Sequence, residues 1–261
     1  MSDLIIEDLK DSILKITLNN PSQQNTLSLD FINDLKKIID KADKNDEVKV
    51  IILSSSGKVF SAGHNLKEIK SHRDDKDQGL QFFTTLINSC SDLMIKIINN
   101  SKPIIAEVSG IATAAGCQLV ASCDLAYASE NSKFATPGVN IGLFCSTPMV
   151  ALSRVVKSKH SMEMLLTGDF IDANKAKNIG LINNYFSEDS LVDEIRQMAN
   201  KIANKSSQTV KIGKKAFYNQ AQMKTDDAYK YASEIMIENM MNKDSDEGIS
   251  AFLEKREPNW S

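Results

Sequence analysis

Two turns rich in small residues have the pattern of a site that binds a negatively charged oxygen through the backbone. The apolar run 103–108 leads to small residues at 114–116, and the apolar run 48–54 leads to small residues at 62 and 63. A helix that begins after such a turn has backbone N–H groups without intrahelical partners, and these favour an anion. One amide from each turn, aimed at one oxygen, would form an oxyanion hole. The alternative is that small residues only allow a helix and a strand to cross closely.

The motifs around both turns resemble a known family. FSAGHNLKE, followed further on by KPIIAEVSGIATAAGCQLVASCDLAYAS, is similar to segments of the crotonase superfamily, also called the enoyl-CoA hydratase/isomerase family. The resemblance continues through FATPGVNIGLF, LLTGDFIDANKAKNIGLIN and the ending EGISAFLEKREPNW. It covers nearly the whole chain in the family's order, and it therefore supplies expectations for the fold, the site and the assembly.

The resemblance places an oxyanion hole at the backbone N–H groups of His64 and Ala115, which would bind the thioester carbonyl of an acyl-CoA. Donors aimed at this oxygen would stabilise the negative charge of an enolate without a catalytic side chain. The substrate contacts that the resemblance implies are Ala62, His64, Asn65, Leu66, Lys67, Ala115, Phe252 and Lys255. Phe252 and Lys255 would approach from an adjoining region or subunit. Lys67 could meet a phosphate as a point charge, or it is a solvated helix lysine.

Two positions depart from the pattern that the resemblance implies. Typical hydratases of the family carry two glutamates that position and activate water. The first of these positions holds Gln118 in this chain, and the second holds Gly138. An amide cannot take a proton from water at ordinary pH, and glycine has no side chain. We therefore expect that efficient hydration by the standard route does not occur.

Other side chains could replace the missing acids, and each has an alternative interpretation. The ring of His64, with an unperturbed pKa of about 6.5, could act as an acid or base, or it points away and only its N–H matters. The acidic and histidine side chains at 68–75 border the acyl pocket or form a solvated surface. Cys145 and Ser146 lack sequence support for the nearby base that a nucleophile needs, so we expect a packed or pocket-lining thiol. Asp124, beside a strand start, is interpreted as structural.

Three functions stay open at this stage. The first is an enzyme of fatty-acid or acyl-CoA metabolism that stabilises a thioester enolate, a lyase or isomerase, with isomerisation, decarboxylation and thioester hydrolysis as possible reactions. The second is an acyl-CoA-binding protein without catalysis, which the residues at positions 118 and 138 favour. The third is an ordinary enoyl-CoA hydratase, against which the missing glutamates count.

Composition narrows the classes of partner. The chain has 261 residues, 42% of them hydrophobic, with a net charge of −3 and its lysines mixed with acids, so neither nucleic acid nor a membrane surface is an expected partner. No apolar run approaches the roughly 20 residues of a membrane helix, and no signal peptide is visible, so we expect a cytoplasmic protein. The 4 cysteines and 3 histidines lack metal-ligand or disulfide spacing. We expect no metal and no separate cofactor, since coenzyme A would arrive as part of the substrate.

Hydrophobic periodicity predicts strands that dominate the chain before about residue 140 and helices after it. The predicted strands are 4–6 and 13–18 as a hairpin, 48–53, 103–108, 124–128, one beginning at 134, and 181–185. The predicted helices are 29–42 with Ser28 as N-cap, 80–98, one from 114, 149–156, 160–166, 173–178, 189–205, 209–220, 226–241 and 247–254. The polar segment 71–79 is interpreted as a mobile loop or a weak helix.

The order of these elements favours an α/β fold. Strand–helix alternation suggests right-handed repeats around a core. The family resemblance implies a crotonase-like spiral of ββα units, here residues 1–200, followed by a helical C-terminal region, residues 201–261. In the family this region builds a homo-oligomer, a trimer or a dimer of trimers. From the residues alone, its apolar faces could equally cover the chain's own core.

Overall fold

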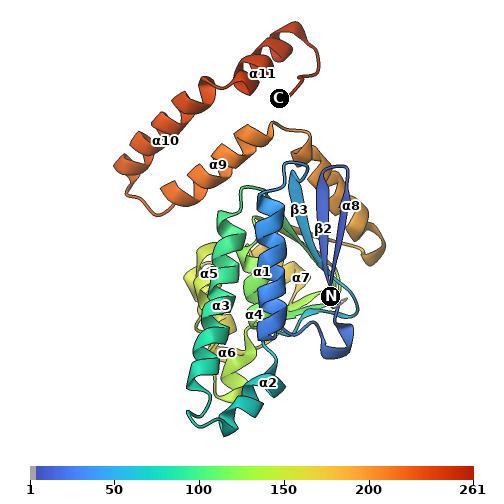
Figure 1. The fold of residues 1–261 in the computed structure, drawn as a ribbon, viewed down its shortest axis with the longest axis vertical. Helices are drawn as coiled ribbons and strands as arrows, with labels where there is room; N and C mark the ends of the chain where they lie inside the picture. Colours follow the sequence, from blue (N-terminus) through green and yellow to red (C-terminus); the bar gives the residue numbers. More distant parts are fainter. Residues whose placement is uncertain (1–3) are drawn as a thin grey trace.

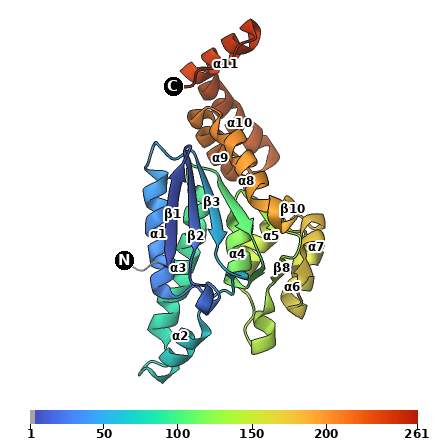
Figure 2. The same ribbon diagram turned by 90° about the vertical axis from the view of Figure 1, so that its right-hand side faces the viewer.

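The computed structural model describes residues 4–261, and at its centre lies a six-stranded mixed sheet. Figures 1 and 2 show this sheet with helices on both of its faces. The strand order is β1-β2-β3-β5-β7-β10, in which β1 and β2 are antiparallel and all later neighbours are parallel. The strands are β1 (Ile5–Lys10), β2 (Ile13–Leu18), β3 (Val50–Ser55), β5 (Ile104–Val108), β7 (Leu125–Ser129) and β10 (Asn184–Phe186).

A smaller four-stranded sheet has the order β4-β6-β8-β9. Its strands are β4 (Val59–Ser61), β6 (Ile111–Thr113), β8 (Lys133–Ala135) and β9 (Ile171–Asp172). The pairs β3-β4, β5-β6 and β7-β8 each place one strand in the large sheet and the next in the small sheet. Helices follow each pair and make the crossover that parallel neighbours require. The expected α/β spiral of ββα units is therefore confirmed.

Alternate residues of the central strands point into two separate apolar layers. Ile51 and Leu53 of β3 pack with α1 and α3, whereas Val50 and Ile52 pack with α8 on the opposite face. Because alternate side chains of a strand point to opposite faces, a strand that is buried on both faces is apolar along its length, and β3 has this pattern. The covering helices are α1 (Leu29–Asp43), α3 (Leu80–Asn99) and α8 (Glu188–Ala203).

Shorter helices complete the core, and among them α4 is buried along its whole length. Its small residues let it lie between the small sheet and α3, with which it is in contact. The helices are α2 (Leu66–Ser71), α4 (Ala115–Ser122), α5 (Pro148–Val155), α6 (Ser158–Thr167) and α7 (Ala173–Asn178). The 3-10 helices within residues 4–261 are η1 (Pro21–Gln23), η2 (His72–Asp74) and η3 (Pro137–Ile141).

The last three helices, α9 (Ser207–Gln220), α10 (Thr225–Met240) and α11 (Lys243–Glu254), form what we call the C-terminal arm. Both ribbon views place α11 at the end of the molecule opposite to α2 (Figures 1 and 2). Neither α9 nor α10 has a buried residue within the chain. The expected boundary at residue 200 falls inside α8, whose contacts with the large sheet continue the core. The division into two domains stays a prediction.

A buried ion pair attaches the arm to the large sheet. The carboxylate of Asp124 accepts hydrogen bonds from Lys214 Nζ at 2.6 Å, from Tyr218 Oη at 3.0 Å and from Ile104 N at 2.7 Å. Lys214 also donates to the carbonyl oxygens at the end of α3 and the start of β5. Burial, together with the carboxylate of Asp124, raises the pKa of Tyr218. The structural interpretation of Asp124 is confirmed.

The elements differ from the predictions mainly at turns. The first strand of the hairpin does not end at residue 6 but continues to Lys10, and the turn lies at Asp11 and Ser12, which adopt positive φ values of 53° and 61°. The last strand, β10, begins at Asn184 and not at residue 181. The segment 71–79 contains η2 and a turn closed by the hydrogen bond between Asp75 N and His72 O.

Candidate functional site

The start of α4 is held in an unusual backbone conformation. Ala114 has φ 50° and ψ −118°, a region that non-glycine residues rarely occupy. Its N–H donates to Ala135 O, and its carbonyl accepts from Gln118 N, each at 3.0 Å. These two hydrogen bonds hold the peptide group between Ala114 and Ala115 in place, so they also fix the direction of the Ala115 N–H bond.

The turn between β4 and α2 is tied to the loop that follows β2. Leu27 N donates to Gly63 O at 2.8 Å, and Ala62 N donates to Gln24 O at 3.1 Å. The fully buried Asn25 donates through Nδ2 to two backbone carbonyl oxygens, those of residues 56 and 59. Gly63 adopts φ 83°, which favours glycine. The position of His64 is therefore determined by several hydrogen bonds from one neighbouring loop.

The two turns lie in contact with each other. A methyl group at Gly63 would lie 3.1 Å from the backbone nitrogen of Ala115 and 3.0 Å from the Cβ of Ala114. A methyl group at Gly116 would lie 2.3 Å from the carbonyl oxygen of Ser61. No hydrogen bond within residues 4–261 uses the N–H of His64 or of Ala115. Glycine at positions 63 and 116 thus permits the two turns to approach each other. The N–H groups of His64 and Ala115 stay without an acceptor.

A cleft of about 490 Å³ opens beside the first turn. It is lined by Ser22, Gln23, Gln24, Thr26, Ala62, His64, Asn65, Leu66 and Lys67. Five of the expected substrate-contacting residues therefore come together here, with Lys67 the only charged side chain among those that line it. The sequence reasoning missed the four residues from the loop 22–26. Because the parallel strands β2 and β3 end at the same edge, the polar segment after β2 was a signal that could have found them.

Part of the segment expected to contact the substrate forms hydrogen bonds at the start of α2. The carboxamide oxygen of Asn65 accepts from Lys67 N at 3.1 Å and from Glu68 N at 3.3 Å, so Asn65 caps this helix. Glu68 accepts from Leu29 N, the first residue of α1, at 3.4 Å. Burial raises the pKa of Glu68, with a smaller contribution from Asp30. Leu66 and Lys67 are exposed at the mouth of the cleft.

Three buried polar atoms beside these turns form no hydrogen bond within residues 4–261. They are His64 Nε2, Gln118 Oε1 and Thr136 Oγ1. Gln118 is 4% exposed and Thr136 is 1% exposed. Burial lowers the pKa of His64 from 6.5 to about 4, so its ring is neutral at pH 7. An imidazole of this pKa is a weak base near neutrality and carries no proton to donate as an imidazolium.

The second expected glutamate position is closed by the backbone. A methyl group at Gly138 would lie 2.4 Å from the carbonyl oxygen of Leu143 and 2.9 Å from Cys145 Sγ. Leu143 N donates to Gly138 O at 2.9 Å, and Gly138 N donates to Cys145 Sγ at 3.4 Å. The loop from η3 to α5 is therefore packed over the space that a longer side chain would need. Cys145 is a packed thiol whose pKa is raised by burial, as expected.

Residues 8–261 match the protein family described as enoyl-CoA hydratase/isomerase. The chain belongs to this family. Enoyl-CoA hydratase domain-containing protein 3, mitochondrial, of Rattus norvegicus is 47% identical over 97% of this chain and 82% of its own. A crystal structure of the human enoyl coenzyme A hydratase domain-containing protein 3 has a TM-score of 0.94 and 45% identity, and covers 98% of this chain and 100% of that chain. An enoyl-CoA hydratase of Mycobacterium smegmatis has a TM-score of 0.94 and 42% identity, and covers 99% of each chain.

The enoyl-CoA hydratase/isomerase relatives overturn one expectation. The prediction of a cytoplasmic protein is wrong, because the name of the rat relative places that protein in the mitochondrion. The prediction used the absence of a visible signal peptide and of an apolar run long enough to cross a membrane. Neither absence determines the compartment of a protein.

The structure leaves Phe252 and Lys255 at a distance from the other expected site residues of this family member. Phe252 lies in the last turn of α11 and Lys255 is the residue that follows this helix, which lies opposite to α2 in Figure 1. Phe252 is 83% exposed and borders an apolar groove on the arm together with Trp260. Within one chain these two residues do not complete the cleft at Lys67.

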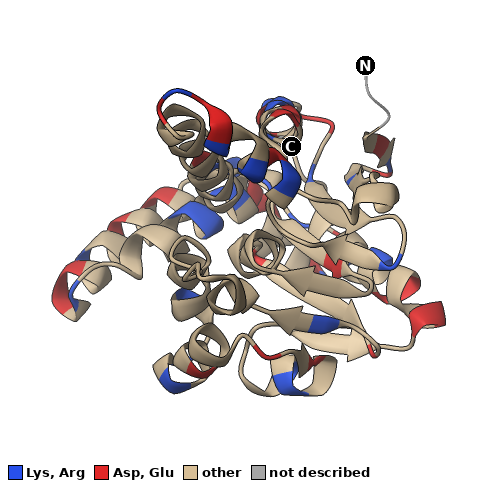
Figure 3. Ribbon diagram, turned by 90° about the horizontal axis from the view of Figure 1, so that it is seen from below, with Lys and Arg blue, Asp and Glu red and all other residues tan. Residues whose placement is uncertain are grey.

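Figure 3 shows Lys and Arg interspersed with Asp and Glu on the face seen from below. The side chains at 68–75 include the pair His72 Nδ1 and Asp75 Oδ2 at 2.7 Å, with the His72 ring stacked on Phe82. No helix among residues 4–261 is long and apolar enough to cross a membrane. The same residues contain no group of three or more potential metal ligands.

Proposed function

We propose that the chain binds acyl-CoA thioesters and stabilises an enolate of the acyl group through the backbone amides of His64 and Ala115. The observation that carries this proposal is the contact between the two turns, with both amides free of acceptors within residues 4–261. Negative charge on the thioester oxygen of an enolate is the charge that two such donors would stabilise. Loss of one donor of this kind typically lowers a rate by a factor of about 10² to 10³.

Coenzyme A would enter as part of the substrate, so the proposal includes no separate cofactor. The cleft at residues 22–26 and 62–67 would receive it, and the Lys67 ammonium would meet a phosphate. Phe252 and Lys255 could reach such a ligand only from a second copy, because their own chain holds them at the far end. A homo-oligomer, a trimer or a dimer of trimers, belongs to the same proposal.

The reaction would differ from standard hydration of an enoyl-CoA. The amide of Gln118 has no basic lone pair for the proton of water, and Gly138 has neither a side chain nor room for one. The relatives named hydratases make ordinary hydration the outcome that similarity suggests. These two residues are the reason for proposing another reaction at the same pair of amides, such as isomerisation or decarboxylation through an enolate, or thioester hydrolysis through a tetrahedral oxyanion.

Two measurements test the proposal. Calorimetric titration with acetyl-CoA and crotonyl-CoA should show saturable heat, and absence of binding at millimolar ligand would contradict the whole proposal. A crotonyl-CoA hydration assay should show negligible turnover. Hydration at the roughly 1 to 10³ s⁻¹ that is typical of enzymes would contradict the inference from Gln118 and Gly138.

The second candidate is a protein that binds acyl-CoA without catalysis. It is favoured by the pKa of about 4 at His64, which leaves this ring neutral and weakly basic near neutrality. Exchange of the α-protons of butyryl-CoA in D₂O distinguishes the two candidates, because exchange requires the enolate. Exchange above the uncatalysed rate supports the enzyme, and binding without exchange supports the second candidate.

A further inference from the structure

Four lysines line one small pocket at the end of the large sheet that lies away from the cleft at Lys67. Lys49 directly precedes β3, and Lys102 lies two residues before β5. Lys205 lies between α8 and α9, and Lys211 lies in the second turn of α9. Their pocket, which we call the lysine pocket, has a volume of about 110 Å³. The cleft is lined by the loop after the carboxyl end of β2, which is parallel to β3, so the two sites lie at opposite ends of these strands.

The lysine pocket carries an excess of positive charge. Among residues 4–261 the only acidic side chain that lines it is that of Asp46, so four lysines against one aspartate leave a formal charge of +3, in a chain whose net charge is −3. Within the same residues the four ammonium groups form no ion pair and donate no hydrogen bond. Like charges around one small space repel one another, and an anion between them would remove this repulsion.

The carboxylate of Asp244, which is attracted by Lys49, is already occupied. Its Oδ2 accepts from Ser206 Oγ, and its Oδ1 accepts from the N–H and the hydroxyl group of Ser261. The hydrogen bond from Ser206 is the largest cause of the lowered pKa of Asp244, and the charge of Lys49 is the smallest. Asp244 therefore holds the start of α9 and the chain end together, and it leaves most of the charge of the lysine pocket uncompensated.

The start of α9 adds hydrogen-bond donors to the four lysines. Ser207 and Gln208, the first two residues of this helix, also line the lysine pocket. No hydrogen bond within residues 4–261 uses their N–H groups, and the first turn of α9 has no acidic residue. The positive end of a helix dipole attracts an anion as the ammonium groups do. Both features therefore favour the same sign of ligand charge.

The size of the lysine pocket and its donors limit the ligand to a small anion with several charges. Its volume is well below the roughly 300–1,000 Å³ of pockets that take drug-sized molecules. Ammonium groups bind phosphate oxygens as point charges, and four of them match an anion with more than one charge. We propose that the lysine pocket binds a diphosphate group, either free pyrophosphate or the diphosphate of a nucleotide. This inference does not depend on the proposed binding of acyl-CoA.

Calorimetric titration with sodium pyrophosphate and with ADP, at low ionic strength, tests the inference on four proteins. They are the natural chain, the two pocket variants Lys49→Gln/Lys102→Gln and Lys205→Gln/Lys211→Gln, and the control Lys157→Gln/Lys159→Gln, which removes two exposed lysines elsewhere. The natural chain and the control should bind pyrophosphate with a dissociation constant of about 1 mM or lower. Each pocket variant should bind it about tenfold more weakly, and added salt should weaken binding to the natural chain. Tighter binding of ADP than of pyrophosphate would identify a nucleotide as the source of the diphosphate, and the reverse would identify free pyrophosphate.

Three results would overturn the inference. The first is the absence of saturable heat with millimolar pyrophosphate and ADP, and the second is equal affinity of the pocket variants and the control. The third is loss of binding in Lys67→Gln, which would place the anion in the cleft proposed for acyl-CoA.

Urea unfolding without added phosphate gives a second measurement that needs no ligand. Both pocket variants should unfold at the same urea concentration as the control or at a higher one, because glutamine in place of lysine relieves the repulsion between like charges. A clear decrease in both pocket variants would show that the lysines are already paired within the fold, against the inference. The natural chain should unfold at a higher urea concentration when pyrophosphate is added, since a ligand of the folded state stabilises it.

Discussion

At the scale of single residues, the backbone at the start of α4 is strained and its neighbours are glycines. Ala114 has positive φ with a Cβ, a conformation that costs on the order of 1–3 kcal/mol and clusters at functional sites. Two backbone hydrogen bonds and the contact with Gly63 hold it. The contacts that bring the two turns together therefore also hold Ala114 in its strained conformation.

Gly138 gives the first testable prediction. Gly138→Ala should lower the free energy of unfolding by about 2 kcal/mol, because the new methyl group would overlap the Leu143 carbonyl. Gly213→Ala is the matched control, since nothing lies within 4 Å of its added methyl group in α9, and it should be neutral or slightly stabilising. Urea unfolding measures both. Equal effects of the two changes would show that the loop at 138–145 is not packed as described.

His64 gives a prediction on pH dependence. Its folded pKa of about 4 lies below the unfolded value of 6.5, so between these pH values the unfolded chain binds the extra proton. The resulting stability is fully present above pH 6.5 and is lost as the pH falls towards 4. Relative to His64→Asn, the natural chain should lose about 3 kcal/mol more over this window, measured by urea unfolding. Parallel loss in both proteins would contradict the burial of the ring.

At the scale of elements, the arm depends on one buried ion pair for its attachment to the large sheet. The Lys214 side chain is 7% exposed and that of Asp124 is 16% exposed. A partner removed from a buried pair leaves a buried charge without compensation, which is strongly destabilising. Tyr218 and Ile104 would keep only part of the hydrogen bonding of the carboxylate.

Lys214→Ala should therefore lower the free energy of unfolding by about 3 kcal/mol. The matched control is Lys215→Ala, which removes the exposed lysine next to it in α9 and should change stability by less than about 0.5 kcal/mol. Urea unfolding at pH 7 measures both variants. Indistinguishable midpoints for the two would show that the ion pair with Asp124 contributes nothing to the attachment of the arm.

Most elements could be predicted from the sequence, but the second sheet could not. The run 48–53 predicted β3 because it is buried on both faces, and Ser28 predicted the start of α1 through its cap. The strands β4, β6 and β9 have only two or three residues each, too few for a period of two to appear. Their pairing with residues far away in the chain is what makes them strands.

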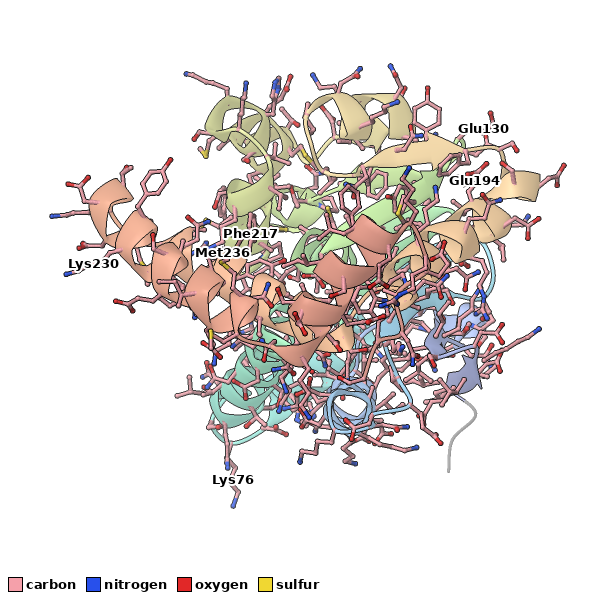
Figure 4. All side chains as sticks on the ribbon, turned by 90° about the horizontal axis from the view of Figure 1, so that it is seen from above. Lys76, Glu130, Glu194, Phe217, Lys230 and Met236 are labelled. Atoms are coloured by element: carbon pink, nitrogen blue, oxygen red, sulfur yellow. The ribbon has the colours of Figure 1, made fainter. Side chains whose placement is uncertain are left out.

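At the scale of the whole molecule, the arm presents apolar side chains that its own chain does not cover. Figure 4 places Phe217 of α9 and Met236 of α10 on this arm, with Lys230 at its outer part. Although their side chains are apolar, Phe217 is 61% exposed and Met236 is 59% exposed. Such a concentration of apolar surface marks an interface in soluble proteins. It is consistent with the oligomer that forms part of the proposed function.

We therefore predict that the chain sediments as three or six copies, and that Met236→Lys shifts the distribution towards single chains because it places a charge within the contact. Lys230→Ala, on the same helix, is the control and should leave the distribution unchanged. Sedimentation velocity at micromolar concentration measures all three proteins. A natural chain that sediments as a single copy would contradict the assembly and leave Phe252 and Lys255 without a route to the cleft.

The amino-acid sequence by itself determined the two small-residue turns, the residues at 118 and 138 and most of the helices, because these features depend on local residue types and on periodicity. Only the tertiary structure decided that the turns touch, that the loop 22–26 lines the cleft and that Phe252 lies at the far end. It also decided that Leu143 fills the space beside Gly138 and that burial keeps His64 neutral. Contact, free volume and desolvation depend on neighbours that are distant in the chain, and no local pattern specifies them.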